Sequence, residues 1–198
     1  MSTSSKGFSK KELVSILEVI EASQNCVTPL DVSTLLLQAK DLVSADYSIC
    51  GMGRLYEGEI KDVIAVVNGN YPTEWLDVYF SEKFYRHDPV VRYHKSFSPA
   101  QTWSDILPRY DDVESRLVVG NAWDFGLRHG ISTSVFSPGS EDLTIFAFAG
   151  GKDTFRGRQK EILDMLSLHL NGALLRVVRR GHRPLKPPTS LEEIPGLF

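Results

Sequence analysis

Two strand–turn–strand patterns separate the helical segments of this 198-residue chain. The first runs from Asp46 to Val67 around the turn Tyr56-Glu57-Gly58-Glu59, and the second joins 131–136 to 143–149. Runs of β-branched and aromatic residues bounded by Gly, Pro, Asn and Ser are typical of hairpins. Hairpins interleaved with helices predict an α+β fold. We expect an α-β-α sandwich whose mainly antiparallel sheet of about five strands carries helices on both faces.

Capping residues mark the helical segments. Ser9 and Glu12 form a capping box that starts a helix over about residues 10–23, and Thr28-Pro29 gives a similar signal for a second helix. Further helices are expected from Pro72, from Asp88-Pro89, from Asp111 to Phe125 and from Thr154 to Arg179, with a short strand at Gln101-Thr102-Trp103. Gly126 is placed to end the helix before it with a left-handed residue.

Length and composition fit one folded domain, with 42% hydrophobic and 24% charged residues. The net charge of −3 does not favour nucleic acid or an anionic membrane as a partner. Two cysteines, no charged-then-apolar leader and no bilayer-length apolar run predict a soluble, cytoplasmic protein. We expect a flexible N-terminus over residues 1–8, a domain over 9–181 and a proline-rich linker or tail over 182–198.

The sequence carries no pattern typical of a metal or cofactor site. Its five histidines are scattered, without a second ligand at metal-binding spacing. A nucleophile elbow, a P-loop and a dinucleotide fingerprint are all missing from the sequence. We therefore expect no cofactor, no metal and no enzymatic activity.

Polar aromatic residues and one carboxylate are concentrated between Tyr71 and Trp103. Tyr71, Trp75 and Tyr79 are spaced at i, i+4 and i+8 and would lie along one helix face. A buried phenol or indole needs a hydrogen-bond partner, which a polar ligand can supply. The alternative is that the rings pack in the core and bond to backbone carbonyls. Asp88 has a simpler reading as a helix N-cap.

The ordered series Tyr71-Pro72, Trp75, Tyr79, Asp88-Pro89 and Trp103 resembles the autoinducer-binding domain of LuxR-type quorum-sensing regulators. The resemblance extends more weakly over residues 9–180. It implies an α-β-α sandwich that encloses an N-acyl-homoserine lactone. The ligand site that we predict comprises Tyr71, Trp75, Tyr79, Asp88, Val90, Trp103, Leu127, Ser132 and Ala147.

The resemblance also implies roles for the matched residues. Trp75 would donate to the lactone carbonyl, Asp88 would accept the amide N–H, and Tyr71 would donate to the acyl carbonyl. Tyr79 and Trp103 would pack against the acyl chain and the lactone ring. Head-group hydrogen bonds would then set the ligand class, and chain length would tune affinity at about 0.8 kcal/mol per buried methylene.

The chain departs from the family pattern on the sheet. Ala147 stands where several relatives place a Ser or Thr that bonds the acyl carbonyl. Ser132 would replace that hydroxyl if its side chain points inward, but a shift of one residue would turn it outward. The orientations of Phe146 and Phe148 are ambiguous for the same reason.

A second departure concerns DNA. Family members normally carry a C-terminal helix-turn-helix domain, whereas the seventeen residues after Gly181 include four prolines and would not form two packed helices. We expect DNA contact only through such a domain, which is absent from this sequence. The sequence leaves open whether the chain is a shortened regulator or a domain that lacks DNA binding.

Three functions follow from these patterns. The first is a sensor that binds an N-acyl-homoserine lactone or a related acyl amide and forms a homodimer. The second is a ligand-independent dimerisation module that modulates a full-length LuxR-type regulator. The third is an enzyme acting on acylated amides with Asp88 as a base. The first accounts for the greatest number of the residues between Tyr71 and Trp103.

Overall fold

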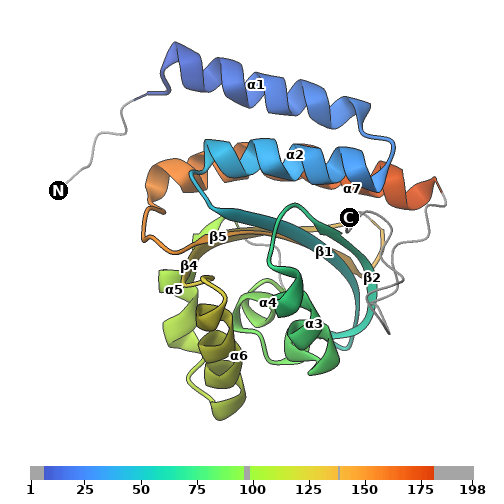
Figure 1. Cartoon of the computed structure of the whole chain (residues 1–198). Helices are drawn as coiled ribbons and strands as arrows, with labels where there is room; N and C mark the ends of the chain where they lie inside the picture. The colour runs from blue at the N-terminus through green and yellow to red at the C-terminus, as the bar shows by residue number, and fades with distance from the viewer. Residues whose placement is uncertain (1–6, 96–98, 138, 181–198) are drawn as a thin grey trace.

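Helices cover both faces of a five-stranded sheet in the computed structural model of the chain, which describes residues 7–95, 99–137 and 139–180 (Figure 1). The strand order is β2-β1-β5-β4-β3, and every neighbouring pair is antiparallel. The strands are β1 (Tyr47–Tyr56), β2 (Glu59–Asn68), β3 (Gln101–Thr102), β4 (His129–Phe136) and β5 (Asp142–Gly150). The predicted α-β-α sandwich is confirmed.

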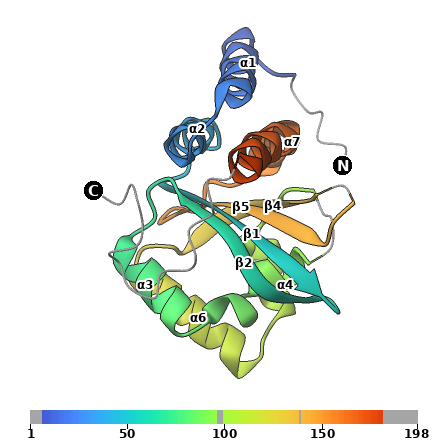
Figure 2. The same ribbon diagram turned by 90° about the vertical axis from the view of Figure 1, so that its right-hand side faces the viewer.

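One helical layer packs tightly on the sheet. It consists of α1 (Lys10–Asn25), α2 (Pro29–Leu42) and α7 (Gly157–Arg179), with α1 outermost (Figure 2). The capping box predicted at Ser9 is formed, and the helix predicted from Thr28-Pro29 begins with a capping box between Thr28 and Asp31. Phe146 and Phe148 of β5 are fully buried among these helices. This half of the domain has a continuous apolar core.

The second layer lies on the opposite face of the sheet (Figure 1). It contains α3 (Thr73–Ser81), η1 (Phe84–Arg86), α4 (Pro89–Tyr93), α5 (Trp103–Ile106), η2 (Leu107–Arg109) and α6 (Val113–Asp124). These helices are short, and their buried residues form a separate cluster around Trp75, Trp103 and Leu127. The sheet therefore separates two cores.

The β1–β2 hairpin turns tightly and bends. Glu57 and Gly58 both have positive φ, at 51° and 77°, as expected for a two-residue hairpin turn that matches the strand twist. The register shifts between Met52 and Gly53 and again between Arg54 and Leu55. Such bulges bend a strand, and here they occur where β1 and β2 pass over the second helical layer.

The helix α3 begins at Thr73, one residue after the predicted start, and Pro72 is its N-cap, so Tyr71 precedes the helix. Asn68 holds Tyr71, because its side-chain oxygen accepts from the Tyr71 N–H at 2.7 Å and its amide donates to the Tyr71 carbonyl at 3.0 Å. These bonds hold the Tyr71 backbone outside the helix and fix where its ring enters the second layer.

Other boundaries shift by a few residues. Trp103 begins α5 instead of ending the short strand, α6 begins at Val113, and α7 begins at Gly157. Gly126 has a φ of +81° after α6, as predicted. Residues 1–6 of the expected N-terminal segment and the expected tail over 182–198 lie outside the described residues.

None of the helices in residues 7–95, 99–137 and 139–180 is both long and apolar enough to cross a membrane. The same described residues contain no group of three or more His, Cys, Asp or Glu side chains that could hold a metal ion.

Candidate ligand-binding pocket

A cavity of about 160 Å³ lies between the sheet and the second helical layer. On the sheet side, alternate residues of the strands line it, as expected from the period-2 orientation of side chains. The alternating residues are Ile49, Gly51 and Gly53 of β1 and Leu143, Ile145 and Ala147 of β5, and the cavity also touches Cys50, Met52, Ile60, Val63 and Val66 of the β1–β2 hairpin. The floor of the cavity is thus apolar, with small residues at its centre.

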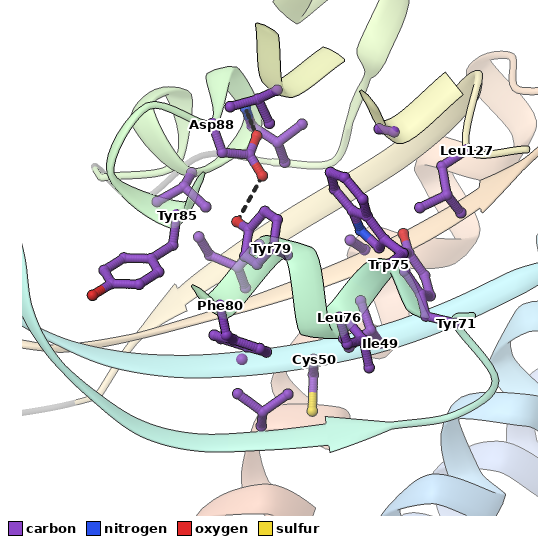
Figure 3. Close-up of a pocket in the computed structure, with 18 of the residues that line it drawn as sticks. Ile49, Cys50, Tyr71, Trp75, Leu76, Tyr79, Phe80, Tyr85, Asp88 and Leu127 are labelled. Atoms are coloured by element: carbon purple, nitrogen blue, oxygen red, sulfur yellow. Dashed lines mark hydrogen bonds between the residues drawn. The ribbon is translucent and has the colours of Figure 1, made fainter. Parts of the chain in front are cut away.

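Aromatic and branched side chains of the helices form the opposite wall (Figure 3). They include Trp75, Leu76, Tyr79 and Phe80 of α3, Val90 and Val91 of α4, Trp103 of α5, and Val118, Val119, Ala122 and Trp123 of α6. Apolar walls with a few polar groups are typical of pockets for small molecules.

Eight of the nine predicted site residues line this cavity, namely Tyr71, Trp75, Tyr79, Asp88, Val90, Trp103, Leu127 and Ala147. They come from three helices, three loops and one strand, and the fold brings them together on one side of the sheet. Ser132 does not line the cavity.

The Trp75 indole is held by other rings. Its centroid lies 5.4 Å from Tyr79, 6.0 Å from Phe84 and 5.7 Å from Phe125, all in tilted arrangements. Contacts of this kind stabilise aromatic side chains beyond simple burial. Trp75 is therefore fixed in orientation before any ligand arrives.

Asp88 has both of the roles that the sequence suggested for it, a helix cap and a cavity residue. One carboxylate oxygen caps α4 by accepting from the Val90 N–H at 2.7 Å. The other accepts from the Tyr79 hydroxyl at 2.8 Å (Figure 3). Burial raises the pKa of Asp88, and these two hydrogen bonds act against that rise. A carboxylate has about four lone-pair sites, so room remains for another donor.

The Tyr71 hydroxyl is buried without a hydrogen-bond partner among the described residues, although it belongs to the cavity wall. Burial, and then the nearby negative charge of Asp88, raise the pKa of Tyr71, so the phenol stays protonated and able to donate. An unpaired buried hydroxyl is costly, which favours a ligand acceptor at this point.

Ser132 and Ala147 lie directly opposite each other in the β4–β5 register, so their side chains share the cavity face of the sheet. The Ser132 hydroxyl, however, is 2.9 Å from Nε2 of His94, which is fully buried. Ser132, which the sequence suggested as a replacement for the hydroxyl missing at Ala147, therefore engages His94 and does not line the cavity. Burial lowers the pKa of His94 to about 4, so the imidazole is neutral at pH 7.

Sequence reasoning missed several lining residues. Gly51 and Gly53 leave the sheet floor open, and the alternation Cys50-Gly51-Met52-Gly53 was the available sequence signal. Tyr85 lies in the wall near the end of α3, and Trp123 lines the cavity although it is 48% exposed. Because Trp123 lines the cavity and is also half exposed to solvent, it lies at an edge of the cavity.

Comparisons with known proteins agree with this geometry. The family model described as the autoinducer binding domain matches residues 30–174. The transcriptional activator VanR of Vibrio anguillarum is 24% identical over 174 residues, which cover 87% of this chain and 70% of VanR. The activator TraR of Agrobacterium vitis is 37% identical over 76 residues, covering 38% of this chain and 32% of TraR.

Solved structures share the fold. CepR2 of Burkholderia cenocepacia, described as an N-acylhomoserine lactone dependent LuxR family transcription factor, has a TM-score of 0.66 at 18% identity, covering 85% of this chain and 97% of CepR2. SdiA in complex with octanoyl-rac-glycerol has a TM-score of 0.69 at 17% identity, covering 93% of this chain and 73% of SdiA. VanR and TraR are both described as transcriptional activator proteins. Since the family model spans most of its length, the chain belongs to the autoinducer-binding domain family of LuxR-type regulators.

Proposed function

We propose that this domain binds an N-acyl-homoserine lactone or a related acyl amide inside the cavity between the sheet and the second helical layer. The observation that carries the proposal is the Tyr71 hydroxyl, which is buried on the wall of an apolar cavity without a partner among the described residues.

The polar groups suit an amide. A buried amide needs an acceptor for its N–H and a donor for its carbonyl. Asp88 retains free lone pairs, and Tyr71 retains its O–H. A hydrogen bond to a charged group contributes about 1.5–3 kcal/mol, so Asp88 would favour amides over esters.

The apolar part of the cavity suits an acyl chain. From Tyr71 the floor continues over Ile49 and Ala147 to Gly51 and Gly53, with no charged side chain on the sheet side. Each methylene buried there would add about 0.8 kcal/mol.

The similar structures offer two ligand types for comparison. CepR2 is named as dependent on N-acylhomoserine lactone, and SdiA was solved with octanoyl-rac-glycerol. Both ligands combine an acyl chain with a small polar head. Only the lactone has an amide N–H for Asp88, and we therefore propose the amide as the preferred class.

Thermal unfolding with a ligand series tests the proposal. A ligand that binds the folded state alone raises stability by mass action. We expect the melting temperature to rise with N-acyl-homoserine lactones, to rise less with matched acylglycerols, and to rise less in Trp75→Phe than in the native chain. Unchanged melting across lactones of four to twelve acyl carbons would contradict the proposal.

Mass spectrometry after incubation tests whether binding occurs without chemistry. We propose that the ligand is released intact, as expected of a receptor. A product with an opened lactone or a cleaved amide, formed by the native chain and not by Asp88→Asn, would favour the enzyme instead.

A second candidate function is dimerisation, with or without ligand. Exposed apolar side chains support it, since Leu17 of α1 is 62% exposed and Leu168 of α7 is 66% exposed. Such residues are enriched where proteins associate. Light scattering of the native chain and of Leu168→Glu would detect a homodimer and its loss, while a strict monomer would remove this candidate.

A further inference from the structure

Two side chains of α7 reach past the edge of the sheet to the segment that leads into the second helical layer. Oδ1 of Asp164 accepts a hydrogen bond from the Ala100 N–H at 2.6 Å. Nζ of Lys160 lies 2.9 Å from Oε1 of Gln101 and 2.7 Å from Oδ2 of Asp105. Figure 1 shows the start of α7 and α5 on opposite faces of the sheet, at the same end of it. A helix of the first layer therefore contacts a helix of the second.

Residues 100–107 pass from one core of the domain to the other. Ala100 is buried in the core under α1, α2 and α7, whereas Trp103 and Leu107 belong to the cluster of the second layer. Trp103 and Leu107 also line the cavity. The placement of this segment thus sets part of the cavity wall.

The segment has little regular structure of its own to hold it in place. β3 pairs with β4 at two positions, and α5 has four residues and no side-chain cap at its N-terminus. Helices this short gain little stability from their own hydrogen bonds and depend on tertiary contacts. Asp164 and Lys160 supply such contacts on both sides of Trp103.

These contacts differ from isolated surface ion pairs, which contribute little. Ala100 is 2% exposed, so its N–H needs an acceptor, and the carboxylate of Asp164 provides a charge-assisted one. The side chain of Lys160 is 27% exposed and bridges two acceptors. Its hydrogen bond is the largest cause that lowers the pKa of Asp105. Loss of either contact would free the segment on one side of Trp103.

Building on the proposed function, we propose that Lys160 and Asp164 are positioning residues for ligand binding, which clamp residues 100–105 and so fix the part of the cavity wall that α5 carries. Neither residue lines the cavity. Because coupling between two sites is reciprocal, a ligand that packs against this wall also strengthens the hold of α7 on the segment. α7 thereby responds to the cavity although the sheet lies between them.

Binding of N-octanoyl-homoserine lactone to three variants tests this role. Lys160→Met removes the bridging charge, and Asp164→Ala removes the acceptor of the Ala100 N–H. We expect each to weaken binding about three- to tenfold. Lys160→Arg keeps the charge and several donors, so its affinity should stay within about twofold of native.

Arg158→Met is the matched control. Arg158 lies two residues from Lys160 on α7, but it pairs with Glu12 of α1 in the first layer, at 2.8 Å. A purely structural loss would lower the melting temperature of this variant and leave its lactone affinity within about twofold of native. Native affinity in both Lys160→Met and Asp164→Ala, or an equal loss of affinity in Arg158→Met, would overturn the inference.

Hydrogen exchange of the unchanged chain avoids any folding defect of the variants. With saturating lactone, the Ala100 amide that Asp164 accepts should exchange about fivefold more slowly, beyond any slowing of the amides of α1. Equal slowing at Ala100 and in α1, or none at Ala100, would overturn the inference. A native chain that binds no lactone would instead overturn the proposed function on which the inference rests.

Discussion

The Tyr79 hydroxyl donates a 2.8 Å hydrogen bond to the buried carboxylate of Asp88, whose other oxygen caps α4. One aspartate thus links α3 to α4 and forms part of the wall of the cavity. Several expectations depend on this arrangement.

Tyr79→Phe should destabilise the ligand-free domain by about 1–3 kcal/mol at pH 7. The substitution keeps the ring but removes the donor, which leaves a buried charge with one partner fewer. It should also raise the pKa of Asp88 further, since the Tyr79 bond lowers it. Denaturant unfolding would measure the loss of stability, and a variant as stable as the native chain would contradict the pairing.

Tyr71→Phe should have the opposite profile. Because the Tyr71 hydroxyl has no partner among the described residues, its removal should leave the ligand-free stability within about 0.5 kcal/mol of native or raise it. The stabilisation by acyl-homoserine lactone should fall. Melting curves of both tyrosine variants, with and without ligand, would check this contrast. A large loss of ligand-free stability in Tyr71→Phe would contradict it.

Acid should destabilise the domain through His94. The folded pKa is about 4, against 6.5 for an exposed histidine, so the unfolded chain binds more protons between these values. Stability is then lost as the pH falls from about 7 to 4, by about 3 kcal/mol for this group. His94→Gln should flatten the pH dependence by that amount. The contribution of Asp88 has the opposite sign and is common to both proteins, so it cancels in the difference.

Gly51→Ile should shorten the acyl channel. A Cβ on Gly51 would meet only the Ala65 carbonyl oxygen, at 3.9 Å, so a side chain there projects into the cavity. We expect at least tenfold weaker binding of a dodecanoyl lactone and near-native binding of a butanoyl lactone, measured by calorimetry. Gly120→Ala is the control, because a Cβ there meets nothing within 4 Å and the residue is exposed on α6. Equal losses for both chain lengths would place the acyl chain elsewhere.

Ala147→Ser should restore a hydroxyl on the cavity floor. Without ligand the added hydroxyl is placed in an apolar cavity opposite Ser132, whose hydroxyl already engages His94, and a cost of about 1 kcal/mol is expected. With an acyl amide bound, the affinity should rise about two- to fivefold. Weaker binding in this variant would place the acyl carbonyl away from β5.

The helices were largely predictable because their signals are local. The capping box at Ser9 and the Thr28-Pro29 start signal lie within four residues of the helices they start, and the structure confirms both helix starts. Asp88-Pro89 likewise starts a helix as predicted. The helix predicted from Pro72 begins at Thr73 with Pro72 as its N-cap, but the bonds by which Asn68, in the preceding strand, holds the backbone of Tyr71 were not visible in the sequence.

The faces of the sheet were not predictable in the same way. Phe146 and Phe148 turn toward α1, α2 and α7, and Ala147 turns toward the cavity, which depends on how β5 registers with β1 and β4. Ser132 lies on the same face of the sheet as Ala147, but its hydroxyl contacts His94 and the residue does not line the cavity. His94 is 38 residues from Ser132 in the sequence, so local sequence patterns do not predict this contact.

The sheet divides the domain into two apolar regions that are packed differently. Under α1, α2 and α7 the chain fills the space with its own side chains, whereas under α3 to α6 it leaves a cavity with unpaired donors. The second helical layer should therefore open locally more often than the first. Its short helices should exchange their amide hydrogens and be cleaved by proteases faster without ligand than with ligand bound. The lifetime of the helical layer formed by α3 to α6 would then increase with the concentration of the bound ligand.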